Sequence, residues 1–129
     1  MTEERRAQLD AFAADLQTQA RPGDQLLIIF QGTGRYLYWN GSIAANSTWL
    51  KPGPDGGLPQ STISYYRRHR VVPSLVVRLF PTAGLTAEQL QAGSAGLDYP
   101  VTLVRPTYVF FRKPPTQSTA EVLARLPRR

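Results

Sequence analysis

The sequence contains no cysteine and only one histidine, His69. Without thiols the chain can form no disulfide, no thiolate nucleophile and no cysteine-bound zinc or iron–sulfur site. A metal site built from His, Asp and Glu also lacks ligands, because few acidic residues lie in the middle of the chain. Paired carboxylates, a nucleophile elbow, a Walker loop and a dinucleotide fingerprint are all missing. We therefore expect no metal, no cofactor and no catalytic residue, and we rank an enzyme last.

Long apolar runs are missing too. The longest run spans positions 26–30, whereas a membrane-spanning helix needs roughly 18 residues. The N-terminal segment is polar and shows no apolar core of a secretion signal. These features predict a cytoplasmic protein of bacterial type that does not bind a membrane.

Negative charge is scarce between Gln25 and Pro115, where the acidic residues are only Asp55, Glu88 and Asp98. The same span holds nine basic residues, so it carries nine minus three, or +6, which equals the formal net charge of the whole chain. The positive field therefore belongs to the middle of the chain rather than to a tail. Such a field favours nucleic acid or an acidic protein as the partner. The alternative is that the arginines serve only solubility.

The length of 129 residues and the hydrophobic content of 42% fit a single globular domain. Apolar periodicity and capping signals predict its elements. We expect an N-terminal amphipathic helix within 1–20, strands at 25–31, 35–39 and 42–50, a helix at 60–70, a strand at 75–80, a short helix from 86 to about 92, strands at 100–104 and 107–113, and a C-terminal helix and tail at 116–129.

Three of these assignments depend on particular local signals. The pair Asn40-Gly41 predicts a hairpin turn between the second and third strands. Positions 51–59 are rich in proline and glycine and predict a surface loop, which is either a binding loop or a tolerated insertion. The segment 60–70 fits a strand as well as a helix, and we favour the helix because Val72-Pro73 would end it.

This order of elements predicts an α+β fold. We expect a single domain with a mostly antiparallel sheet of about five to six strands, preceded by the N-terminal helix. Short helices would pack on one face of the sheet. The other face would then be wet or would bind a partner.

Three groups of basic and aromatic residues are candidates for binding nucleic acid, because arginine holds phosphates and aromatic rings stack on bases. In the third group, strand alternation places Tyr108, Phe110 and Arg112 on one face, as a stacking platform would require. The first group is Tyr65, Tyr66, Arg67, Arg68, His69 and Arg70; the second is Arg35, Tyr36 and Tyr38; the third is Tyr108, Phe110, Arg112 and Lys113.

Each group also has an ordinary structural interpretation. The aromatic residues can be cross-strand packing partners, and the arginines can form a solvated helix face. We interpret the chain as a small, non-catalytic nucleic-acid-binding protein, DNA-binding or otherwise, with a preference for single strands. The first alternative is an adaptor or regulatory module that binds an acidic protein, and a homo-oligomer is compatible with either. A metal-independent nuclease using His69, Arg67 and a tyrosine ranks third.

Overall fold

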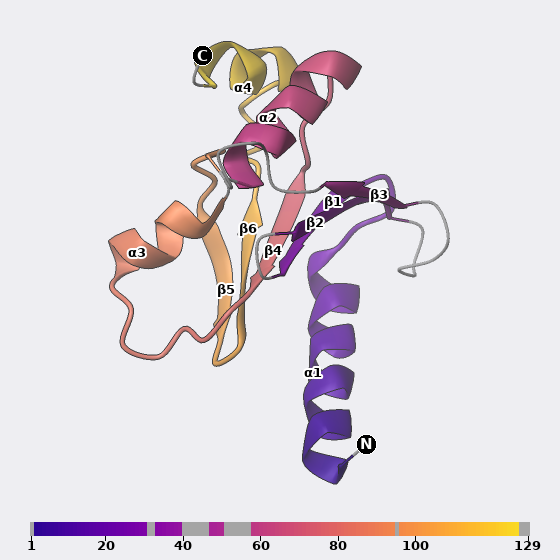
Figure 1. The fold of residues 1–129 in the computed structure, drawn as a ribbon, viewed down its shortest axis with the longest axis vertical. Coiled ribbons are helices and arrows are strands. Elements are labelled where there is room, and N and C mark those ends of the chain that lie inside the picture. The colour runs from indigo at the N-terminus through magenta and orange to yellow at the C-terminus, as the bar shows by residue number, and fades with distance from the viewer. Residues whose placement is uncertain (1, 31–32, 40–46, 51–57, 95, 127–129) are drawn as a thin grey trace.

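The computed structural model describes residues 2–30, 33–39, 47–50, 58–94 and 96–126 (Figure 1). These residues form four α-helices, one short 3₁₀-helix (η1) and six strands. In chain order they are α1 (Glu3–Gln19), β1 (Gln25–Phe30), β2 (Thr33–Tyr38), β3 (Ser47–Leu50), α2 (Leu58–His69), β4 (Leu75–Leu79), α3 (Ala87–Gln91), η1 (Ala92–Ser94), β5 (Val101–Arg105), β6 (Tyr108–Arg112) and α4 (Thr119–Arg125).

The six strands form one mixed sheet in the order β3-β2-β1-β4-β6-β5. Four of the five neighbouring pairs are antiparallel, and only β1 and β4 run parallel. The expected α+β domain with a mostly antiparallel sheet is confirmed. The parallel pair was not foreseen, and it arises because the chain crosses over through β2, β3 and α2 before it returns beside β1.

Strand β1 lies in the interior of the sheet, as its run of apolar residues predicts. Its side chains alternate between the two faces, so Leu26 belongs to one apolar cluster while Leu27 and Ile29 belong to the other. All three side chains are buried. A strand that buries both of its faces must have cover on both sides of the sheet.

One face of the sheet is covered by short helices and the segments between them. Tyr66 of α2 and Val122 of α4 pack there against Val76, Val109 and Phe111 of the sheet. All five side chains are fully buried. The helix assignment for 60–70 is thereby confirmed, because the stripe that contains Ile63 and Tyr66 faces the sheet.

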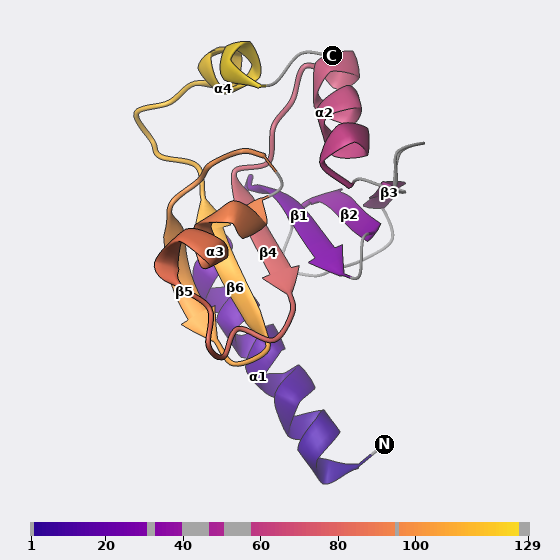
Figure 2. The same ribbon diagram turned by 60° about the vertical axis from the view of Figure 1, so that its left-hand side comes forward.

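Around Leu37 and Phe110 the opposite face is covered by a helix, which corrects our expectation that this face would be wet or would bind a partner. The C-terminal half of α1 lies there, and its Leu16 joins an apolar cluster with Leu37, Trp39 and Phe110. Figure 1 shows α1 and α3 on opposite sides of the sheet, and in Figure 2 part of α1 lies behind β5 and β6. The cause is the pair Phe12 and Leu16, whose apolar side chains pack on this face of the sheet.

The N-terminal half of α1 projects beyond the sheet (Figures 1 and 2). The Thr2 hydroxyl caps the helix by accepting a hydrogen bond from the Arg5 backbone N–H at 3.2 Å. Leu9 is 53% exposed even though it continues the stripe of the buried Leu16. The N-terminal helix is confirmed, but only its last turns are packed against the sheet.

Two more sequence signals are confirmed. Thr86 with Gln89 and Ser118 with Glu121 form capping boxes at the starts of α3 and α4. The turn expected at Asn40-Gly41 lies outside the described residues, as does most of the 51–59 loop. Helix α2 begins at Leu58, two residues before the expected start.

Candidate functional site

The last turn of α2 carries a cluster of basic side chains. Arg67, Arg68, His69 and Arg70 are consecutive and all exposed. A helix C-terminus carries partial negative charge on its free carbonyl groups, so cations are favourable there. We call these four residues the α2 cluster.

Arg70 has an unusual backbone conformation for an arginine. Its φ angle is 54°, in the left-handed region that glycine adopts more readily. The Val71 N–H donates to the Tyr66 carbonyl at 3.1 Å, across the end of the helix. This is the Schellman pattern, in which the left-handed position is usually glycine. An arginine at this position costs stability, and nothing in helix termination requires one.

Beside the α2 cluster lies a shallow groove between α2 and α4. Arg67 and Arg70 line it from one side, and Thr119, Ala120 and Leu123 line it from the other, around a volume of about 470 Å³. The Arg67 guanidinium also donates to the Leu126 carbonyl at 3.1 Å and so joins the two helices. The groove therefore combines an arginine rim with an apolar wall.

The two tyrosines before the cluster differ in burial. The Tyr66 ring is completely buried, so it offers no surface for stacking on a base. The Tyr65 ring is partly buried; its centroid lies 5.0 Å from that of Tyr36 and 4.4 Å from that of His69. Burial raises the pKa of the Tyr66 hydroxyl well above its ordinary value, and the nearby Tyr36 adds to this. Of the aromatic residues in the first predicted group, only Tyr65 and His69 therefore offer surface at this end of α2.

The second predicted group does not come together as one surface. Alternation along β2 puts Tyr36 and Tyr38 toward α2 and places Arg35 on the α1 side of the sheet. Tyr36 is buried, and its hydroxyl donates to the Gln25 side chain. Tyr38 is 63% exposed.

The third predicted group is not a stacking platform, which corrects that expectation. Phe110 is fully buried and Tyr108 nearly so, because α1 covers their face of β6. Phe12 of α1 packs edge-on against Tyr108, with ring centroids 5.1 Å apart. The Tyr108 hydroxyl donates to the Asp15 carboxylate, and burial followed by this bond raises the pKa of Tyr108 to about 12.

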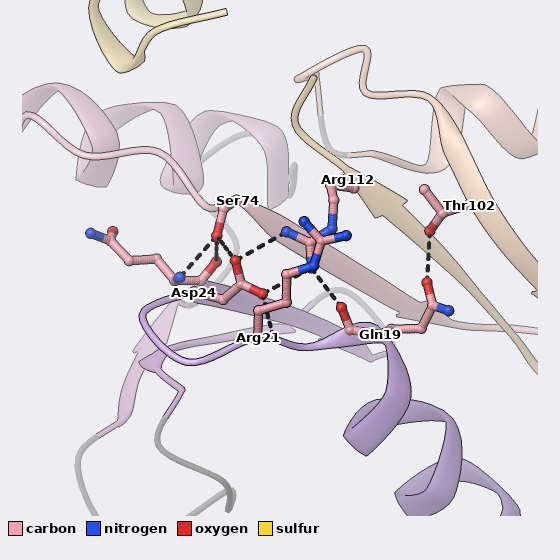
Figure 3. Close-up of polar contacts among 7 residues, drawn as sticks. Gln19, Arg21, Asp24, Ser74, Thr102 and Arg112 are labelled. Carbon is pink, nitrogen blue, oxygen red and sulfur yellow. Dashed lines mark hydrogen bonds and ion pairs between the residues drawn. The ribbon is translucent and has the colours of Figure 1, made fainter. Parts of the chain in front are cut away.

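Arg112 belongs to a buried polar network rather than to a binding surface (Figure 3). Its guanidinium donates to both carboxylate oxygens of Asp24, at 3.0 and 2.8 Å, and to the Gln19 carbonyl at 2.6 Å. Asp24 also accepts from the Ser74 hydroxyl and the Arg21 N–H, each at 2.7 Å. The network ties the end of α1 to β4 and β6. A phosphate could reach Arg112 only by breaking it.

Lys113 is likewise engaged. Its ammonium group donates to the carbonyl oxygens of Pro114, at 3.5 Å, and Gln117, both in the turn before α4. Of the three predicted groups, the structure thus leaves one contiguous exposed basic surface, the α2 cluster.

Sequence reasoning missed the contribution of α4. Thr119 and Leu123 line the groove beside the α2 cluster, yet no local pattern indicates that the C-terminal helix docks there. The Arg125 side chain, which donates to the Leu97 carbonyl, helps to fix α4 in this place. A contact between two helices so distant in sequence leaves no local pattern in a single sequence.

In the part of the chain that the structure describes, no three His, Asp or Glu side chains gather as a metal would require. No helix of that part is long and apolar enough to cross a membrane. The comparisons with known proteins found no matching family model, no matching curated protein and no matching solved structure.

Proposed function

We propose that the protein binds single-stranded nucleic acid, with the phosphates held by the α2 cluster. The observation that carries the proposal is the concentration of exposed positive charge around one helix end. Of the carboxylates that the structure describes, none forms an ion pair with Arg68 or Arg70. Arginine held without a carboxylate partner suits an incoming phosphate, which it contacts in a bidentate manner.

The conformation of Arg70 supports this proposal. A left-handed arginine costs roughly 1–2 kcal/mol relative to a right-handed one. Strain of this kind often marks a functional position. The left-handed position at the end of α2 holds an arginine that lines the groove. Glycine at this position would end the helix without this strain.

The remaining aromatic surface limits how bases would contact the protein. Tyr65 and His69 form a ring pair beside the arginines. Tyr38 lies two residues along β2 from Tyr36, which contacts Tyr65, so its exposed ring extends the same side of the sheet by about 7 Å. A single-stranded oligonucleotide whose phosphates contact the arginines could stack at most a few of its bases on these rings. We therefore expect affinity to come mainly from phosphate contacts and to show little sequence preference.

The test is the salt dependence of binding to a fluorescent single-stranded oligonucleotide. Each phosphate contact on a single strand contributes about −0.7 to the slope of log affinity against log salt. The double variant Arg68→Ala, Arg70→Gly should therefore bind more weakly, with a slope shallower by up to roughly 1.4. The matched control is Arg6→Ala, Arg21→Ala, which removes the same charge from exposed positions outside the groove. It should keep most of the wild-type slope.

If both double variants lose affinity and slope equally, binding follows net charge and the α2 cluster is not the site. Absence of salt-dependent oligonucleotide binding by the wild-type chain would reject the proposed function itself.

One observation favours a second candidate, an acidic protein partner. Ala120 and Leu123 give the groove beside the arginines an apolar wall, which nucleic acid does not need. An acidic peptide with an apolar side chain would use both features. A chain that ignores oligonucleotides at low salt but binds acidic apolar peptides, and loses this through Leu123→Ser, would establish the second candidate.

A further inference from the structure

A second groove lies on the α1 face of the sheet, where three neighbouring strands end. Its floor is a row of side chains in register: Phe30 of β1 pairs with Leu79 of β4, and Leu79 pairs with Tyr108 of β6. Strand alternation puts Phe30 on this face, since it lies two residues from Ile28 of the apolar cluster there. The volume of about 600 Å³ falls within the range of small-molecule sites, roughly 300–1,000 Å³.

One face of α1 forms the wall of this groove. Four residues of that face recur at the i, i+3, i+4 and i+7 spacing and line the groove: Arg5, Gln8, Leu9 and Phe12. Phe12 closes the inner end against Tyr108, with ring centroids 5.1 Å apart. Leu9, nearly one turn closer to the N-terminus, is 53% exposed, and Phe30 of the floor is 52% exposed. The helix therefore covers the row at Tyr108 and leaves it open at Phe30.

The charge at the groove is positive and lies at its outer end. Arg5, two turns before Phe12, is exposed, and none of the acidic residues of α1 lines the groove. No carboxylate of the described residues forms an ion pair with Arg5. The other charged residue of the lining, Arg78, turns to the opposite face of the sheet, where its guanidinium donates to the Gly93 carbonyl at 3.3 Å. The groove is thus apolar along its length and carries one unpaired cation at its mouth.

We propose that this groove binds a fatty acid, that is, a single unbranched acyl chain that ends in a carboxylate. The acyl chain lies over Phe30 and Leu79 beside Leu9, and the carboxylate meets the Arg5 guanidinium at the outer end. Each methylene group that leaves water adds to the affinity. Arginine offers two N–H donors in the plane that a carboxylate needs. A groove that is open at one end suits such a ligand, because only its polar end remains in water.

A protein partner fits this groove less well than a small amphiphile does. A stable protein interface takes about 20–30 residues on each side. Of the large apolar side chains that are exposed in the described part of the chain, Leu9 and Phe30 line the groove, whereas Tyr38 and Val104 do not. Two exposed apolar residues between a helix and a sheet provide the contact area of one acyl chain.

The experiment is a calorimetric titration of the full chain with decanoate below its micellar concentration. The wild type should bind one decanoate per chain in a saturable manner. Arg5→Gln should weaken decanoate binding about tenfold, because it removes one charge-assisted contact. It should not change the binding of decanol, which has the same chain length and no charge. The matched control is Arg6→Gln, which removes the same charge from an exposed position that does not line the groove and should bind decanoate as the wild type does.

Two further variants test the apolar part of the groove. Phe30→Ser and Leu9→Ser should each weaken decanoate and decanol alike, by about tenfold. Both side chains are half-exposed, so circular dichroism should show a folded protein for at least one of the two variants. The double variant Arg68→Ala, Arg70→Gly should bind decanoate as the wild type does, which keeps this test separate from that of the α2 cluster.

Absence of saturable decanoate binding by the wild type would overturn the proposal, even if the chain then bound anionic phospholipid vesicles or an acidic peptide. Equal losses in Arg5→Gln and Arg6→Gln would overturn it as well, because affinity would follow net charge. The same holds if folded Phe30→Ser or Leu9→Ser binds decanoate as tightly as the wild type, or if the α2 cluster variant loses it, because the ligand would then bind elsewhere.

Discussion

Arg70 is the residue at which stability and function are expected to conflict. A glycine there would end α2 with the same Schellman pattern and without the cost of a left-handed side chain. We expect Arg70→Gly to raise the free energy of unfolding by up to about 1 kcal/mol, since the relief of strain exceeds the extra freedom of the unfolded chain. The same variant should bind single-stranded oligonucleotides more weakly. Urea unfolding and anisotropy titration measure the two effects.

Asp98 provides the control, because its φ angle of 57° is equally left-handed and it is exposed in the loop before β5. Asp98→Gly should bring a stability gain of the same sign without loss of oligonucleotide affinity. A loss of stability in Arg70→Gly would show that the arginine side chain makes contacts worth more than the strain that it causes.

Tyr66 separates the packing role of an aromatic residue from a stacking role. Its ring is completely buried between α2 and the sheet. Tyr66→Ala should lower the free energy of unfolding by about 3–5 kcal/mol, as for other large aromatic residues cut from a core. Tyr66→Phe keeps the ring and should retain most of the stability. Thermal unfolding measures both variants, and an alanine variant of unchanged stability that no longer binds oligonucleotides would contradict the packing role.

At the scale of elements, the ion pair between Asp24 and Arg112 joins the end of α1 to the sheet (Figure 3). Burial works to raise the pKa of Asp24, but the Arg112 hydrogen bond and those from Arg21 and Ser74 hold it below the ordinary 3.8. A carboxylate whose pKa is lower in the folded protein stabilises the fold above its unfolded value, and this contribution is lost as pH falls through the folded value. We therefore expect the free energy of unfolding to drop as the solution is acidified below about pH 4.

The variant that tests this is Asp24→Asn, which leaves the largely buried Arg112 charge without its carboxylate partner. It should cost about 3–5 kcal/mol at neutral pH. On acidification the variant should lose less further stability than the wild type. Asp10→Asn, at an exposed position on α1, should behave like the wild type at every pH. The contrary outcome is that Asp24→Asn loses as much stability on acidification as the wild type does. In that case the loss comes from other carboxylates such as Asp15, whose pKa is lowered chiefly by its hydrogen bond with Arg105.

The elements also differ in how well they could be predicted from the sequence. Elements with a local cause were found correctly, such as the capping boxes at Thr86 and Ser118 and the buried strand around Leu27. The sequence did not always predict which side chains of an element are buried, because this depends on which other element covers each face. Tyr108 and Phe110 alternate as a stacking platform would, and only the position of α1 decides that they form a core. The exposed arginines of the α2 cluster needed no such information, since a polar helix end is usually solvated.

At the scale of the whole molecule, the α2 cluster lies far from the exposed N-terminal half of α1. Helices α2 and α4 are at the end of the long axis opposite the N-terminus of α1 in both views (Figures 1 and 2). A substitution in the exposed half of α1 should therefore leave the α2 cluster and its binding of oligonucleotides unchanged.

This geometry predicts how binding depends on oligonucleotide length. One α2 cluster can hold only a few phosphates, so the slope of log affinity against log salt should be the same for a short and a long single-stranded oligonucleotide. Leu9→Glu, on the exposed half of α1, should bind both oligonucleotides as the wild type does. Anisotropy titrations with a length series over a range of salt concentrations measure this. A slope that steepens with oligonucleotide length would mean that the nucleic acid also contacts basic residues outside the α2 cluster.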